Sequence, residues 1–214
     1  MRVEIWADIA CPWCYVGRGR FERGLQAFAH RDEVEVEYRS FELNPTAENG
    51  STPIIDAVAR QYGRTRDEQV AREERAASEA RALGLGYRVG GRVHGNTFDV
   101  HRLLHFAKEH GRQRTLMDLA YRVNFADKRS VYDADTLVDI AVEAGLDGAE
   151  ARRVLADAGA YADDVRADER QASELGATGV PFFVFDRQYG VTGMQPSELF
   201  TQALEQAWQD RRAA

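Results

Sequence analysis

A pair of cysteines separated by two residues, Cys11-Pro12-Trp13-Cys14, constrains the fold of this chain more than any other feature. Residues 2–6, which precede it, are short and β-prone, and proline is favoured in the first turn of a helix. Apolar residues then recur at helical spacing, at Phe21, Leu25 and Phe28. The sequence therefore predicts a strand that leads into a helix, with both thiols at the start of that helix.

The spacing of Cys11 and Cys14 indicates redox chemistry. Two thiols one helical turn apart are close enough to form a disulfide, and the positive end of a helix stabilises a thiolate. We therefore expect Cys11 to be the attacking thiolate and the more deeply placed Cys14 to be the resolving thiol. Pro12 has no N–H to lose in the first turn, and Trp13 is an aromatic residue that can flank the sulfur. We expect both to contact substrate rather than to react.

Redox chemistry is favoured over three simpler origins of the cysteine pair. A chance pair is disfavoured by its position directly after a strand and at a helix start. A zinc site would need two further ligands and no second cysteine pair exists, so no metal is expected. A structural disulfide is unexpected in the cytoplasm, where thiols are kept reduced.

The composition bears on that compartment and on the partners. Twenty-eight Lys and Arg residues against 35 Asp and Glu residues give a net charge of −7, so neither nucleic acid nor an anionic membrane is an expected partner. No run of ~18 apolar residues predicts a transmembrane helix. The first residues lack the basic and apolar regions of a signal peptide. We therefore expect a cytoplasmic protein.

Hydrophobic periodicity divides the rest of the chain. Residues 34–39 alternate apolar and charged side chains, which predicts a strand at a sheet edge with one solvent-facing side. Helical spacing dominates residues 51–158, where Thr65 and Glu68 form a capping-box pattern, and continues in a helix over 161–175. Residues 182–185 are apolar throughout and predict a strand buried on both faces. A short strand over 189–192 and a final helix are expected to follow.

This order of elements predicts an α/β fold. The two β-containing ends, residues 1–50 and 159–214, are expected to meet in one sheet and form one domain. Residues 51–158 are expected to form a large inserted all-helical domain.

The segment Thr178-Gly179-Val180-Pro181, just before the buried strand, is the second informative motif. Proline is tolerated at the first residue of a strand in any protein, so the segment alone decides little. Together with the cysteine pair it resembles the thioredoxin superfamily. The resemblance implies the thioredoxin fold (β-α-β … α-β-β-α), with Pro181 as a cis-proline against the cysteines and Val180 as the residue that pairs with substrate.

Segments across nearly the whole chain are similar to FrnE-type proteins of the DsbA-like branch. They are residues 8–17, 41–45, 96–97 with 101–103, and 179–183. The resemblance implies a cytoplasmic dithiol–disulfide oxidoreductase or isomerase in which the helical domain covers the active site, so Asn96 and His101 are expected to shape the substrate cleft. Kappa-class glutathione transferases and 2-hydroxychromene-2-carboxylate isomerases are relatives, with a serine-centred motif where Cys11 stands here.

Four further positions need separate comment. Ile5 replaces the buried acid that many thioredoxin-like proteins carry six residues before the first cysteine. Asp8 is the nearest carboxylate and a candidate proton relay for Cys14, although helix capping or solvation in a loop accounts for it as well. His101 and His105 lie four apart on one predicted helix, but packing beside an apolar stripe is a simpler interpretation than a metal site.

Three functional hypotheses remain. In the first, Cys11 forms a mixed disulfide with a thiol or disulfide substrate, Cys14 releases it, and an external reductant restores the pair. The second is a glutathione-dependent isomerase or transferase acting on a small organic molecule, for which Cys11 alone is sufficient. The third is a non-catalytic scaffold. No cofactor is expected beyond glutathione as a co-substrate, and the fold relatives leave a homodimer open.

Overall fold

A computed structural model of the protein describes residues 1–127 and 129–213 and contains a four-stranded mixed sheet in the order β2-β1-β3-β4. Strand β1 (Arg2–Ala7) lies in the centre, parallel to β2 (Glu35–Ser40) and antiparallel to β3 (Phe182–Phe185). Strand β4 (Tyr189–Thr192) pairs with β3 as a hairpin. The predicted edge position of β2 is confirmed, and the strands from the two ends of the chain meet in one sheet.

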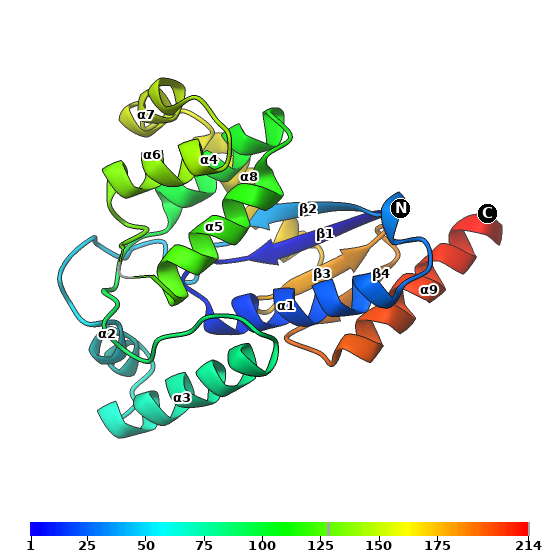
Figure 1. The fold of residues 1–214 in the computed structure, drawn as a ribbon, viewed down its shortest axis with the longest axis horizontal. Coiled ribbons are helices and arrows are strands. Elements are labelled where there is room, and N and C mark those ends of the chain that lie inside the picture. The colour runs from blue at the N-terminus through cyan, green and yellow to red at the C-terminus, as the bar shows by residue number, and fades with distance from the viewer. Residues whose placement is uncertain (128, 214) are drawn as a thin grey trace.

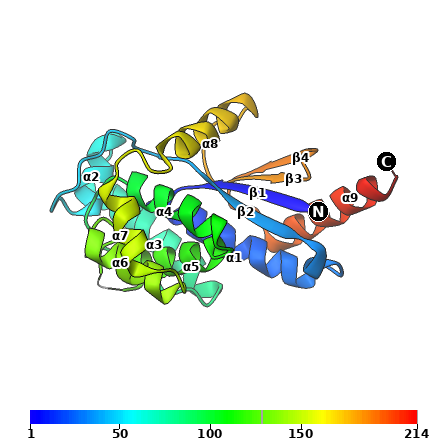
Figure 2. The ribbon, with the colours of Figure 1, turned by 90° about the horizontal axis from the view of Figure 1, so that it is seen from above.

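Helices cover both faces of this sheet (Figures 1 and 2). Helices α1 (Pro12–Ala27) and α9 (Ser197–Ala213) pack together on one face, where the rings of Phe21, Phe183 and Phe200 are fully buried against one another. Truncating one such ring to alanine costs about 3–5 kcal/mol. Gly24 allows the two helices to approach, since a Cβ there would lie 2.5 Å from the Ser197 carbonyl oxygen.

Helix α8 (Ala162–Glu174) lies on the opposite face of the sheet (Figure 2). Beneath it, Trp6 packs with Ala172, Phe182 and Val184 in a second apolar cluster. The Trp6 indole nitrogen donates a hydrogen bond of 2.8 Å to the Asp168 carbonyl oxygen. Strand β3 is therefore buried on both faces, as its uninterrupted apolar sequence predicts.

Six helices between β2 and α8 form the helical block, in which no strand occurs among the described residues. They are α2 (Ile54–Gln61), α3 (Arg66–Ala82), α4 (Phe98–Glu109), α5 (Gln113–Phe125), α6 (Ala134–Glu143) and α7 (Gly148–Ala156). The predicted capping box opens α3, with Thr65 and Glu68 each accepting a hydrogen bond from the other's amide. The block lies beyond the carboxyl end of β1 (Figure 1). Within the described residues no helix is both long and apolar enough to cross a membrane.

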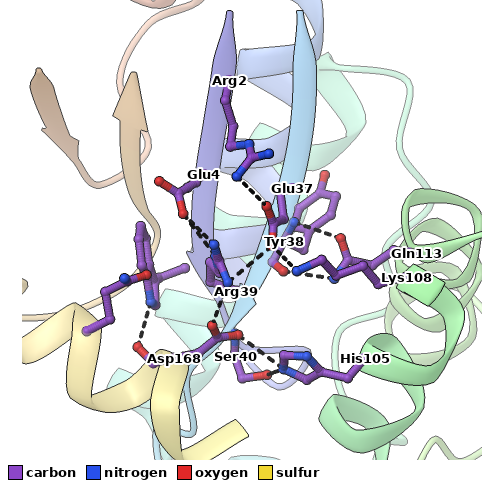
Figure 3. A network of polar contacts seen from close by, with 12 residues as sticks. Arg2, Glu4, Glu37, Tyr38, Arg39, Ser40, His105, Lys108, Gln113 and Asp168 are labelled. Carbon is purple, nitrogen blue, oxygen red and sulfur yellow. Dashed lines mark hydrogen bonds and ion pairs between the residues drawn. The ribbon is translucent and has the colours of Figure 1, made fainter. Parts of the chain in front are cut away.

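The charged side of β2, which begins after a short 3-10 helix η1 (Arg31–Glu33), differs from its prediction. Glu37 is buried, and Arg39 bridges Glu4 at 2.6 Å and Asp168 at 3.0 Å (Figure 3). Lys108 on α4 forms an ion pair with Glu37. The predicted solvent-facing side was wrong because helices α8 and α4 supply charged partners to it. Removing one partner of the buried Arg39–Asp168 pair costs about 3–5 kcal/mol.

Candidate active site

The loop from β1 to α1 places the two thiols at different depths. Cys11 is the residue that caps the N-terminus of α1, with extended backbone angles of φ −84° and ψ 112°. Its Sγ accepts a hydrogen bond of 3.3 Å from the Cys14 amide. Both cysteines are free thiols, and Cys11 lines a cavity whereas Cys14 lies beneath it at 1% exposure. A substrate in the cavity therefore meets the Cys11 sulfur first.

The surroundings of Cys14 keep it protonated. Burial raises the pKa of the Cys14 thiol well above its ordinary value, and the adjacent Cys11 sulfur raises it further. The backbone amide of Asp8 lowers this pKa, whereas the charge of the Asp8 carboxylate raises it. Since the thiolate is the nucleophilic form, Cys14 is the thiol that needs help to ionise.

The segment before β3 packs directly on the cysteine pair. The Val180–Pro181 peptide bond is cis, and the Val180 carbonyl oxygen lies 4.0 Å from Cys11 Sγ. A Cβ on Gly17 of α1 would lie only 2.9 Å from Pro181 Cγ, so glycine is needed for this approach. The structure thus brings Val180 and Pro181 beside the sulfur, where the resemblance to thioredoxin-like proteins put them.

The cavity at Cys11 has a volume of about 370 Å³, within the range of small-molecule sites. Pro12, Trp13 and Val180 line it beside the sulfur. Its far wall comes from the helical block, with Ile54, Val58 and Tyr62 on or just after α2. The thiol is therefore approached through a partly apolar chamber that the helical block closes on one side.

Two arginines lie on the wall of this chamber. Arg64 and Arg72 both line it, and no carboxylate among the described residues lies within ion-pairing distance of either. Arg64 stacks on the Tyr62 ring, with 4.6 Å from its guanidinium carbon to the ring centroid. Two acids also line the chamber: Glu73 is paired with Arg92 at 2.5 Å, and Asp8 accepts two backbone amides. An anionic substrate group is therefore the natural partner for the two guanidinium groups.

Asp8 is buried at the cavity wall and is neither a helix cap nor a solvated loop residue. Its Oδ1 accepts the Ala10 amide at 3.1 Å and its Oδ2 accepts the Leu43 amide at 2.7 Å. Helix α5 holds the same loop, because Asn124 donates a 2.8 Å hydrogen bond to the Ile9 carbonyl oxygen. The helical block thus fixes the conformation of the active-site loop.

Asn96 and His101 do not lie on the cavity wall, contrary to the expectation that they shape the cleft directly; Gly95 and Thr97 occupy that wall instead. Asn96 accepts the Phe98 amide at 2.8 Å, next to the start of α4, and its amide group donates to Glu42 at 3.2 Å. His101 is fully buried, with Nε2 3.6 Å from Asp8 Oδ1. Neither residue therefore lines the cavity: Asn96 contacts the start of α4 and Glu42, and His101 contacts Asp8. Sequence spacing alone does not reveal these contacts.

His105 lies on α4, four residues after His101. His105 Nε2 lies 3.1 Å from Asp168 Oδ2 on α8 (Figure 3). Among the described residues, no group of three or more His, Cys, Asp or Glu side chains is arranged to hold a metal ion. Sequence analysis missed Arg64, Arg72 and His94, because single charged residues beside or on an exposed helix produce no pattern that separates a cavity wall from ordinary surface.

The chain is similar to proteins of one known family. Residues 2–205 match the family model described as the DSBA-like thioredoxin domain. The chain belongs to the DSBA-like thioredoxin family. A probable DsbA oxidoreductase from Streptomyces coelicolor, SCO1869, is 59% identical, with 99% of this chain and 91% of that chain covered and a TM-score of 0.94.

More distant solved structures share the DsbA-like fold. A 2-hydroxychromene-2-carboxylate isomerase is 14% identical, with 100% of this chain and 98% of that chain covered and a TM-score of 0.69. The cytosolic disulfide reductase DsbM from Pseudomonas aeruginosa, in a structure with GSH, is 13% identical, with the same coverage and a TM-score of 0.63. At these identities the likeness concerns the fold alone.

Proposed function

We propose that this DsbA-like protein is a thiol–disulfide oxidoreductase that uses Cys11 and Cys14 as a redox pair. One observation carries the proposal. The Cys11 sulfur lies at the wall of a cavity and accepts the Cys14 amide, while the Cys14 thiol is buried directly beneath it. This is the arrangement that an attacking and a resolving thiol require.

The reaction proceeds by two exchanges. The Cys11 thiolate attacks one sulfur of a substrate disulfide, the substrate S–S bond breaks, and the other substrate sulfur leaves as a thiolate that takes a proton. Cys14 then loses its proton and attacks Cys11 Sγ, which releases the second substrate thiol and leaves a Cys11–Cys14 disulfide. Two electrons pass to the substrate, and an external thiol reductant restores the pair by the reverse exchange.

Four residues beside the sulfur are proposed to hold the substrate. Pro12 and Trp13 flank Cys11 at the cavity wall, and Val180 presents its backbone next to the sulfur. Pro181 fixes that backbone against Gly17 of α1. A substrate sulfur aligned along this segment is held at the distance that in-line attack by Cys11 needs.

A small acidic thiol is the co-substrate that we propose, with glutathione as the first candidate. Its carboxylates suit Arg64 and Arg72, and the chamber of about 370 Å³ suits a small molecule. DsbM, which has this fold, was crystallised with GSH and is described as cytosolic. The proposal therefore includes the cytoplasm, where glutathione is abundant, as the compartment of this protein.

The test is a redox titration of the purified protein. Samples are equilibrated in glutathione buffers of graded poise, quenched, alkylated and read by mass, while the fluorescence of Trp6 and Trp13 is recorded. We expect one two-electron transition between about −270 mV and about −180 mV, the values of thioredoxin and protein disulfide isomerase. Absence of any transition would overturn the proposal.

Cys14→Ser and Cys11→Ser separate the proposed activity from its alternative. Cys14→Ser is expected to accumulate a Cys11–glutathione mixed disulfide and to lose turnover, because a hydroxyl group at position 14 cannot resolve it. Cys11→Ser is expected to be inert. Full turnover of a small organic substrate by Cys14→Ser would instead favour a glutathione-dependent isomerase or transferase.

A further inference from the structure

His101, in the first turn of α4, is a buried titratable group that the two exchanges do not use. It is fully buried, and neither ring nitrogen has a hydrogen-bond partner among the described residues. A neutral imidazole carries one donor and one acceptor, and each costs about 1–3 kcal/mol when buried unpaired. The charged group nearest to the ring is Asp8, with Oδ1 3.6 Å from His101 Nε2. Protonating the ring would convert this contact into an ion pair.

In such a pair, Asp8 remains a hydrogen-bond acceptor. Each of its oxygens already receives a backbone amide, from Ala10 and from Leu43. Both His101 nitrogens, in contrast, are unengaged among the residues that the structure describes. Of the two groups, the imidazole is therefore the one with a nitrogen free to receive a proton, and its protonation would balance the charge of the Asp8 carboxylate.

The charge of Asp8 acts on the thiol that must ionise. Asp8 lines the same cavity as Cys11, and its carboxylate disfavours a thiolate at Cys14. An imidazolium at His101 would cancel that opposition at the moment when Cys14 attacks. The contact between His101 and Asp8 thus links protonation of His101 on the helical block to ionisation of the Cys14 thiol on α1.

We propose that His101 takes up a proton as Cys14 gives one up, so that the resolving thiolate forms beside a neutral Asp8–His101 pair. This inference rests on the proposed function, because it concerns the release of the mixed disulfide. In that step the Cys14 S–H bond breaks, and its electron pair forms the bond to Cys11 Sγ. The bond from Cys11 to the substrate sulfur then breaks, and the substrate leaves as a thiolate. The proton stays on the pair until it returns to the leaving thiolate or to solvent.

His101 acts through Asp8 and is therefore a positioning residue. Besides Cys14, the charge of Asp8 acts on three other titratable groups among the described residues: His94, Tyr121 and Tyr132. Burial raises the pKa of both tyrosines, so they keep their protons when a thiol ionises. Burial lowers the pKa of His94, a partly exposed residue on the cavity wall, and Asp8 raises it. The experiment must therefore separate His101 from His94.

The two exchanges can be timed separately with 5,5′-dithiobis(2-nitrobenzoate) in a stopped-flow instrument. Attack by Cys11 releases the first coloured thiolate, and attack by Cys14 releases the second. His101→Gln is expected to slow the second release about tenfold at neutral pH, because the Asp8 charge then opposes the Cys14 thiolate without compensation. The first release is expected to stay within about twofold of the wild-type rate.

The pH profile of the second release distinguishes proton uptake from a structural role. In the wild type the rate levels off around neutral pH, because the proton stays within the protein. In His101→Gln it rises about tenfold per pH unit, because the proton must go to solvent. Adding Asp8→Asn to His101→Gln is expected to recover part of the lost rate, since the opposing charge is gone. A purely structural role predicts a slower double variant.

His105→Gln is the matched control, since His105 is also buried on α4 but pairs with Asp168 rather than with Asp8. It is expected to leave both releases unchanged. Equal slowing of both releases in His101→Gln, a double variant slower than His101→Gln, or loss of the second release in His94→Gln instead would overturn the inference. If His101→Gln does not fold, Asp8→Asn alone is measured, and a wild-type-like plateau in it would overturn the inference. A wild type that releases one thiolate only would overturn the proposed function itself.

Discussion

Cys11 and Cys14 are identical side chains that the first turn of α1 places in different surroundings. Cys11 faces the cavity and accepts an amide, whereas burial holds the Cys14 pKa high. In the proposed reaction, the different positions of the two thiols therefore set the order of attack. Arg64 and Arg72 are likewise set apart by their surroundings. Both line the cavity, and neither guanidinium group has a carboxylate partner among the described residues.

Replacing Arg72 by glutamine is expected to raise KM for glutathione disulfide by about 1.5-fold to fivefold with little change in kcat. An exposed ion pair contributes about 0.2–1 kcal/mol, and binding is lost equally from ground and transition states. Steady-state kinetics measure the effect. The uncharged bis(2-hydroxyethyl) disulfide is the control, and an equal rise in KM for both disulfides would contradict the role of charge.

Helix α1 contacts two other elements through glycines. Gly17 admits Pro181 beside the cysteines, and Gly24 admits Ser197 at the start of α9. The first contact belongs to the site and the second to the core. The two positions therefore allow chemistry and stability to be separated within one helix.

Gly17→Ala is expected to slow formation of the mixed disulfide at Cys11 by about tenfold, because the new Cβ displaces the Pro181 segment. Gly24→Ala, in contrast, is expected to lower the free energy of unfolding by about 1–3 kcal/mol through overpacking. The folded fraction of Gly24→Ala keeps its reaction rate. Stopped-flow kinetics and urea unfolding test both variants. Similar rates for Gly17→Ala and the wild type would show that the segment accommodates the methyl group.

Elements with strong periodicity were predictable from the sequence, and contacts between elements were not. The helices of the block, the Thr65 capping box and the doubly buried β3 each follow from local spacing. The burial of Glu37 depends on which helices cover β2, and local alternation does not contain that information. The proximity of His101 to Asp8 likewise arises only when the helical block closes over the β1–α1 loop.

A polar network spans the molecule across the α8 face of the sheet. Glu4 on β1 binds Arg39 on β2, and Asp168 on α8 binds His105 on α4 (Figure 3). Glu4 also binds Arg187, which lies between β3 and β4. Burial would raise the pKa of Glu4, but Arg187 and Arg39 outweigh it, so this pKa lies below its ordinary value of 4.5. For Asp168 the bonds from His105 and the Ser40 amide outweigh burial, and its pKa lies below 3.8.

Acid is therefore expected to weaken the whole fold. A carboxyl group whose pKa is lower in the folded state stabilises the protein above its unfolded value and loses that contribution as the pH falls through the folded value. Stability should thus be constant near neutral pH and fall once the pH drops below about 4.5. Urea unfolding from pH 7 to pH 3 measures it. Asp168→Asn should be less stable at pH 7 and show a shallower acid loss, while Glu174→Gln, an exposed change on α8, should follow the wild-type profile.

The shape of the chamber around Cys11 bears on which substrate disulfides we expect to enter it. Cys11 is 4% exposed, and residues of α2 and α3 line the cavity in front of it, so we expect a disulfide held flat in the surface of a folded domain not to reach its sulfur. A short, flexible disulfide, or one in an unfolded stretch of chain, can enter. In the proposed reaction we therefore expect the helical block to exclude the disulfides of folded proteins and to admit those of small molecules and of unfolded chains.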